Sequence, residues 1–171
     1  MKQGRFYIAF LLLLVAQVCI CNYFRFSQYV MITLLPEMIL LIPIRRNTMI
    51  GLFTAFAAGF AVDFLSDGVL GLNIAALLPV ALARTSIIRL VFGDEVFARK
   101  EDISVPRQGI WKMSLAVLMA QALFLVVYIW LDGAGTRPLW FSAVRFGASL
   151  TAGYIFSLFV VETLAPERNR A

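Results

Sequence analysis

The amino-acid sequence predicts an all-α membrane protein built as a bundle of six transmembrane helices. Of its 171 residues, 61% are hydrophobic, and the mean hydropathy is +0.87. Apolar stretches recur along the whole chain, at lengths close to the ~20 residues that a helix needs to cross a bilayer. Backbone groups within hydrocarbon must hydrogen-bond internally, so the predicted spans are helices.

The six predicted spans leave no room for a soluble domain, so we expect a single integral membrane domain over residues 1–171. The spans cover residues 6–23, 28–44, 48–65, 69–92, 110–131 and 139–161. One long polar stretch, residues 93–109, carries charges of both signs, and we expect it to be a solvated loop.

The distribution of basic residues predicts the orientation of the bundle. Of the fifteen lysines and arginines, twelve fall at or near one face of the six-span arrangement. Arg25 and Arg137 fall at the other face, and Arg145 lies within the last span. Positive charge is retained in the cytoplasm, so we expect both termini and loop 93–109 to be cytoplasmic. Because the basic residues flank spans, lipid head groups rather than nucleic acid are their expected partners.

The residue types that most soluble enzymes use are missing. The chain has no histidine, which excludes Ser-His-Asp and Cys-His catalysis. It also has no phosphate-binding loop, dinucleotide-binding glycine pattern or paired CxxC motif. Asp63 and Asp67 lie one turn apart on one span with no matching Asp on another, unlike the aspartates of an intramembrane protease. We therefore expect no catalytic residue, metal site or cofactor.

Four ionisable residues within the predicted spans are candidate structural or functional positions, because each costs roughly 2.5–3.5 kcal/mol at mid-depth. Two of them, Asp63 and Arg145, have compatible depths, and each continues a stripe of small residues at four-residue spacing. We expect these two to form an ion pair between the third and sixth spans. A partner or ligand site and a solvent-facing placement remain the alternatives.

The other two ionisable residues are Glu37 and Arg84. Glu37 follows Pro36, which removes a helical hydrogen bond and predicts a kink in the second span. Glu37 is expected to stay protonated, to bond the carbonyl that the proline frees, or to meet Arg84. For Arg84 we expect instead a side chain that extends to the cytoplasmic face.

The segment from Gly59 to Asn73 resembles the signature of the rod-shape-determining protein MreD family. It reads as a small-residue helix, then G-x-x-x-D-x-x-S over Gly59–Ser66, then L-G-L around Gly71. The Pro36-Glu37 pair resembles the Pro-acidic motif of that family's second span. Length, six-span layout and cytoplasmic termini also fit, so the resemblance covers nearly the whole chain.

The resemblance implies a non-enzymatic inner-membrane component of the bacterial elongation machinery, which acts in cell shape and lateral peptidoglycan synthesis. Such proteins bind MreC and work with MreB, RodA and a class B penicillin-binding transpeptidase. The family is similar in fold to the S components of energy-coupling-factor vitamin transporters, which supply the alternative function. An S component usually carries an Ala-x-x-x-Ala face in its first span, whereas Ala9 and Ala16 here are seven residues apart. The candidate partner-binding or structural residues are Glu37, Gly59, Asp63, Ser66, Gly71, Asn73, Arg84 and Arg145.

Overall fold

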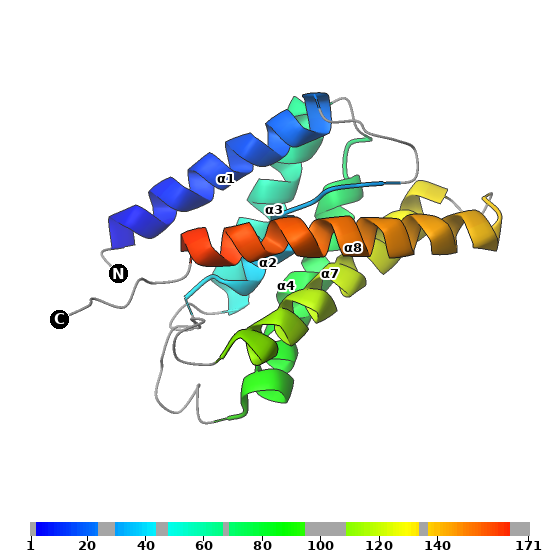
Figure 1. Ribbon diagram of the computed structural model, residues 1–171. Coiled ribbons are helices and arrows are strands. Elements are labelled where there is room, and N and C mark those ends of the chain that lie inside the picture. Colours follow the sequence, from blue (N-terminus) through cyan, green and yellow to red (C-terminus); the bar gives the residue numbers. More distant parts are fainter. Residues whose placement is uncertain are drawn as a thin grey trace.

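The computed structural model describes residues 3–23, 30–43, 48–66, 69–94, 109–133 and 137–164, and in these ranges the chain is helical almost throughout (Figure 1). The helices are α1 (Gln3–Tyr23), α2 (Leu35–Leu40), α3 (Thr48–Leu65), α4 (Leu72–Phe92), α7 (Ile110–Gly133) and α8 (Leu139–Leu164). Three of them are long and apolar enough to cross a membrane: Thr48–Leu65, Leu72–Phe92 and Trp111–Gly133. Within the described ranges the expected all-helical fold is therefore confirmed, and the three apolar helices indicate a membrane protein.

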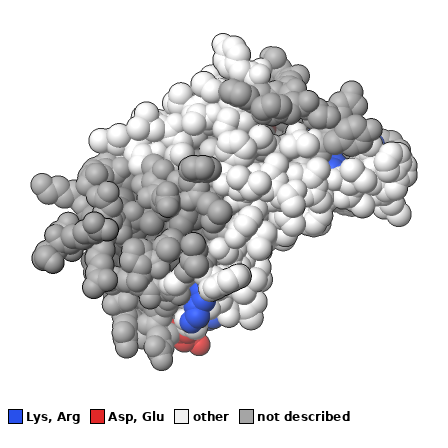
Figure 2. All heavy atoms as spheres, in the orientation of Figure 1, with Lys and Arg blue, Asp and Glu red and all other residues white. Residues whose placement is uncertain are grey.

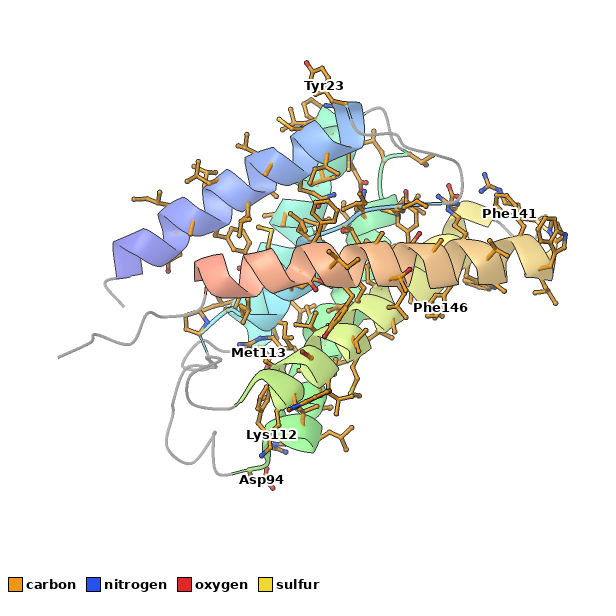
Figure 3. All side chains as sticks on the ribbon, viewed as in Figure 1. Tyr23, Asp94, Lys112, Met113, Phe141 and Phe146 are labelled. Carbon is orange, nitrogen blue, oxygen red and sulfur yellow. The ribbon has the colours of Figure 1, made fainter. Side chains whose placement is uncertain are left out.

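The helices form one bundle in which α3 packs on α4, α4 on α7 and α7 on α8, while α1 lies more loosely against α2, α3 and α8. In Figure 1, α1 begins and α8 ends on the same side of the molecule. Figure 3 shows Asp94 and Lys112 together at the lower end of the bundle, with Tyr23 and Phe141 away from them toward the top and right. The helix ends thus gather on opposite sides, as expected for segments that cross a membrane alternately.

The surface of the described residues is apolar between these ends. Figure 2 shows that the described part of this face is mostly uncharged, with charged atoms at the lower end, where α4 ends and α7 begins, and a small basic spot near the right-hand end. On α3, the exposed rings of Phe56, Phe60 and Phe64 stack in succession, with centroids 6.3 and 5.9 Å apart. An exposed apolar surface of this extent suits contact with lipid chains rather than with water.

The second predicted span differs from the prediction. A helix was expected over residues 28–44, but between residues 30 and 43 only Leu35–Leu40 is helical, and Val30–Leu34 lies outside any helix. Pro36 is the reason, because proline lacks an N–H group and its fixed φ suits the first turn of a helix. A helix therefore begins at Leu35 with this proline in its first turn, where a kink had been expected. All six residues of α2 are buried.

Side chains from two other helices bond backbone groups of the non-helical segment Val30–Leu34. The carboxamide of Gln17 on α1 accepts from the Leu34 N–H at 2.7 Å and donates to the Ile32 carbonyl at 3.3 Å. From α8, the Ser149 hydroxyl accepts from the Met31 N–H at 2.9 Å. Backbone groups inside a bundle need protein partners where helical bonds are missing, and Gln17 and Ser149 supply such partners here.

Candidate functional site

The residues of the Gly59–Asn73 segment meet where α3 ends and α4 begins. The buried carboxylate of Asp63 accepts four hydrogen bonds. Its Oδ2 accepts from the N–H groups of Gly71 at 2.9 Å and Ile74 at 3.3 Å. Its Oδ1 accepts from the N–H of Asn73 at 3.1 Å and from the side-chain Nδ2 of the same residue at 2.8 Å. Asp63 thus caps the first turn of α4, where unpaired N–H groups and the helix dipole favour a negative charge.

Two further residues of the segment shape the turn around Asp63. Gly71 has φ +95°, a left-handed conformation that glycine adopts without strain. This conformation helps bring the first N–H groups of α4 onto the carboxylate. Ser66 donates its hydroxyl to the Val62 carbonyl, which completes the last turn of α3. Ser66, Gly71 and Asn73 therefore contribute to the same capped turn as Asp63.

Gly59 lets α3 and α4 approach closely. A Cβ atom at Gly59 would lie 2.9 Å from both the Cα and the backbone nitrogen of Ile74, so the α4 backbone would have to move. Small residues allow membrane helices to pack at such short range. The predicted stripe of small residues that ends at Asp63 is confirmed, since Gly51, Ala55, Gly59 and Asp63 are all buried.

Outside the capped turn, the tip of the α3–α4 hairpin is apolar and exposed. Phe64 and Leu65 at the end of α3, and Val69 and Leu70 before α4, expose between 56% and 69% of their surface. The tip is also tied to α1, because the Asn22 side chain donates to the Leu65 carbonyl at 3.0 Å. The hairpin therefore presents four apolar side chains on a backbone that polar contacts hold in place.

The expected ion pair between Asp63 and Arg145 is wrong. Arg145 pairs with Asp132 at the end of α7, and Arg137 approaches the same carboxylate oxygen at 3.1 Å. Asp63 instead accepts the four bonds of the α4 cap. Compatible depth was not enough to identify the partner, because each charged group has a closer partner within its own hairpin.

Arg84 also departs from expectation. Its residue is only 6% exposed, so the predicted extension to the cytoplasmic face is wrong. Its Nε donates to the Leu40 carbonyl at 3.2 Å, and a terminal nitrogen donates to the Ile42 carbonyl. A cation here satisfies the carbonyl groups that the C-terminus of α2 leaves unpaired.

Glu37 lies apart from the hairpin, fully buried in α2. Neither carboxyl oxygen has a hydrogen-bond partner in the described part of the chain, so the expected bonds to Arg84 and to a freed carbonyl are wrong. Its expected protonation stays a prediction. Gln121 in α7 is likewise fully buried with an unpaired carboxamide, and it presses against Gly153 of α8.

Sequence reasoning missed four residues that matter to this arrangement: Gln17, Gln121, Asp132 and Ser149. A polar side chain in an apolar stretch is the signal that could have found the two glutamines, because such a group in hydrocarbon needs a partner within the protein. The comparisons do not extend this list. No known family model, curated protein or solved structure matches the chain.

Proposed function

We propose that the chain is a non-enzymatic scaffold of the MreD type in the inner membrane of a bacterium. It would bind MreC and, with MreB, RodA and a class B penicillin-binding transpeptidase, support cell shape and lateral peptidoglycan synthesis. One observation carries the proposal. The residues that resemble the MreD signature form a single structural device, the capped turn between α3 and α4.

The geometry of this device favours a scaffold over a catalyst. Four N–H groups engage the buried Asp63 carboxylate, so its hydrogen bonds serve the α4 cap. Gly59 and Gly71 set how closely the helices approach and how the turn bends. The result is a fixed tip that exposes Val69 and Leu70. A membrane-anchored partner such as MreC could pack its apolar side chains against this tip.

The proposed topology has six crossings with both termini in the cytoplasm. In it, Val30–Leu40 forms an irregular crossing inside the bundle, while α1 and α8 cross beside α3, α4 and α7. Reporter fusions test the topology directly. Fusions at Ala171 and in residues 93–109 should report cytoplasm, and a fusion at Asp67 should report the opposite side. A cytoplasmic signal at Asp67 would contradict the six-crossing arrangement.

Co-purification with MreC tests the function. The full chain, co-expressed with MreC and extracted in mild detergent, should give a complex whose mass in native mass spectrometry is the sum of the two proteins. The Gly71→Leu variant, which forces a bulky residue into φ +95°, should insert but lose MreC and round up a rod-shaped cell. Nanomolar binding of a vitamin would favour a transporter S component instead, and capture of neither would reject the proposal.

A further inference from the structure

The end of the α7–α8 hairpin carries a surplus of positive charge that the proposed function does not use. Arg137 and Arg145 both approach one carboxylate oxygen, Oδ2 of Asp132, and the Arg137 distance is 3.1 Å. Two guanidinium groups and one carboxylate leave this three-residue cluster with a net charge of +1. The cluster can therefore accept a further anion without reversing its charge.

Arg145 also has a hydrogen-bond donor without an acceptor. Its Nε is buried and has no partner in the described part of the chain, while its guanidinium lies 5.9 Å from the centre of the Tyr128 ring. Arginine has five N–H donors and no acceptor, and a buried donor left unpaired costs free energy. Asp132 does not accept a hydrogen bond from this Nε, so the cluster lacks an acceptor for it.

The cluster lies at the depth of lipid head groups. The apolar stretch of α7 that could cross a membrane, Trp111–Gly133, ends one residue after Asp132. Trp130 and Trp140 flank the cluster and are 72% and 64% exposed. Tryptophans gather at the boundary between hydrocarbon and head groups. Figure 3 shows Phe141, which follows Trp140 in the chain, at this far end of the bundle.

Arg137 is the more solvent-accessible of the two arginines in the cluster. Its side chain is 42% exposed, against 13% for Arg145, and its guanidinium lies 5.5 Å from the centre of the Phe141 ring. A ligand approaching from the membrane surface would therefore reach Arg137 first. Leu139, two residues further along the chain, is 88% exposed and offers an apolar surface for a lipid chain.

We propose that Asp132, Arg137 and Arg145 form a binding site for the phosphate group of an anionic membrane lipid. Guanidinium groups bind phosphate oxygens through paired charge-assisted hydrogen bonds. The surplus charge favours an anionic head group over a zwitterionic one. Free phosphate offers the same acceptor atoms but no chain to lie along Leu139 and Trp140, so the site selects the lipid.

Native mass spectrometry of the full chain in neutral detergent tests the site. The chain is titrated with phosphatidylglycerol and with phosphatidylcholine of identical acyl chains, and inorganic phosphate is added in a separate arm. One surplus arginine near a membrane surface is worth about fivefold in affinity, so phosphatidylglycerol should bind about fivefold tighter than phosphatidylcholine. Equal binding of the two lipids, or of free phosphate and phosphatidylglycerol, would overturn the assignment.

Matched variants locate the binding. Arg137→Gln removes the open donor and leaves the Asp132–Arg145 pair, so it should weaken phosphatidylglycerol binding about fivefold. Arg89→Gln removes the same charge from an exposed arginine that pairs with Asp94 at 3.3 Å at the opposite end, and it should leave binding unchanged. Asp132→Asn raises the surplus charge and should tighten binding. Equal losses in the two arginine variants would show that only the total charge matters and would reject the site.

Discussion

The α3–α4 hairpin and the segment Val30–Leu40 both contain backbone groups that need hydrogen-bond partners outside a regular helix, but they find these partners at different distances along the chain. Each contains backbone groups that leave the regular helical pattern inside the bundle. In the hairpin, Asp63 satisfies N–H groups that lie 8 to 11 residues further along the chain. In Val30–Leu40, which we call the central segment, the partners lie 17, 44 and 118 positions away in sequence.

The difference shows which part of the molecule depends on the assembled bundle. The hairpin needs only its own two helices, because the carboxylate and the N–H groups that it caps lie on neighbouring elements. The central segment needs α1, α4 and α8 in place at once, since Gln17, Arg84 and Ser149 each supply part of its hydrogen bonding. Substitutions in the two regions should therefore have distinguishable effects.

The largest expected effect is at the hairpin cap. Asp63→Asn would replace a charged acceptor by an amide whose NH₂ group faces backbone N–H donors, and we expect a loss of about 3 kcal/mol in the free energy of unfolding. Denaturant unfolding in detergent measures this loss. Asp94→Asn, at an exposed ion pair, is the matched control and should change nothing measurable. A loss below about 1 kcal/mol for Asp63→Asn would mean that the cap contributes little.

Substitutions at two buried glutamines test the hydrogen bonds that hold the central segment. Gln17→Leu would leave the Leu34 N–H and the Ile32 carbonyl unpaired inside the bundle, so we expect destabilisation by about 2 kcal/mol. Gln121→Leu removes a carboxamide that has no partner in the described part of the chain, and it should be neutral or stabilising. Both changes turn a fully buried glutamine into leucine, so they differ mainly in the hydrogen bonds lost. Equal losses in unfolding free energy would refute the bonding assigned to Gln17.

Substitutions at two glycines of α3 test how closely α3 and α4 pack in the hairpin. Gly59→Ala places a methyl group 2.9 Å from the α4 backbone and should cost about 1–3 kcal/mol. Gly51→Ala, on the same face, meets no atom within 4 Å and should be neutral or slightly stabilising, because alanine favours the helix. Thermal unfolding of the two variants side by side gives the comparison. If both melt at the same temperature, α3 and α4 are not in close contact at Gly59.

The smallest expected effect distinguishes the two possible partners of Arg145. A double-mutant cycle on Asp132→Asn and Arg145→Gln should give a coupling of about 1 kcal/mol, since both side chains are mostly buried. The cycle on Asp63→Asn and Arg145→Gln should be additive. Coupling in the second cycle and additivity in the first would restore the pairing that depth alone suggested.

The sequence predicted the hairpin well and the central segment poorly. The stripe of small residues through Gly59 and Asp63 follows from helical spacing, and the helical stretches 48–65 and 110–131 nearly match α3 and α7. The role of Asp63 was mistaken, because an acid near the end of a span can pair across the bundle or cap the next helix. The depth of Asp63 along its span does not distinguish between these two roles.

The central segment escaped prediction for a different reason. Residues 28–44 are apolar enough to suggest a helix, and hydropathy does not reveal that Gln17 and Ser149 can replace helical hydrogen bonds. Pro36 indicated a disturbance but not its form, since proline is compatible both with a kink and with the first turn of a helix. The partners of Arg84 and Arg145 were missed because they depend on contacts between helices far apart in the chain.

Capture of MreC by two surface variants tests most directly the claim that the α3–α4 hairpin is the partner surface. Leu70→Ser changes an exposed residue of the hairpin tip, and Leu139→Ser changes a more exposed leucine at the α7–α8 hairpin. Both should fold as the unchanged chain does. We expect Leu70→Ser to weaken MreC binding about tenfold, through the loss of one buried leucine contact, and Leu139→Ser to bind normally. Undiminished binding by Leu70→Ser would contradict the claim.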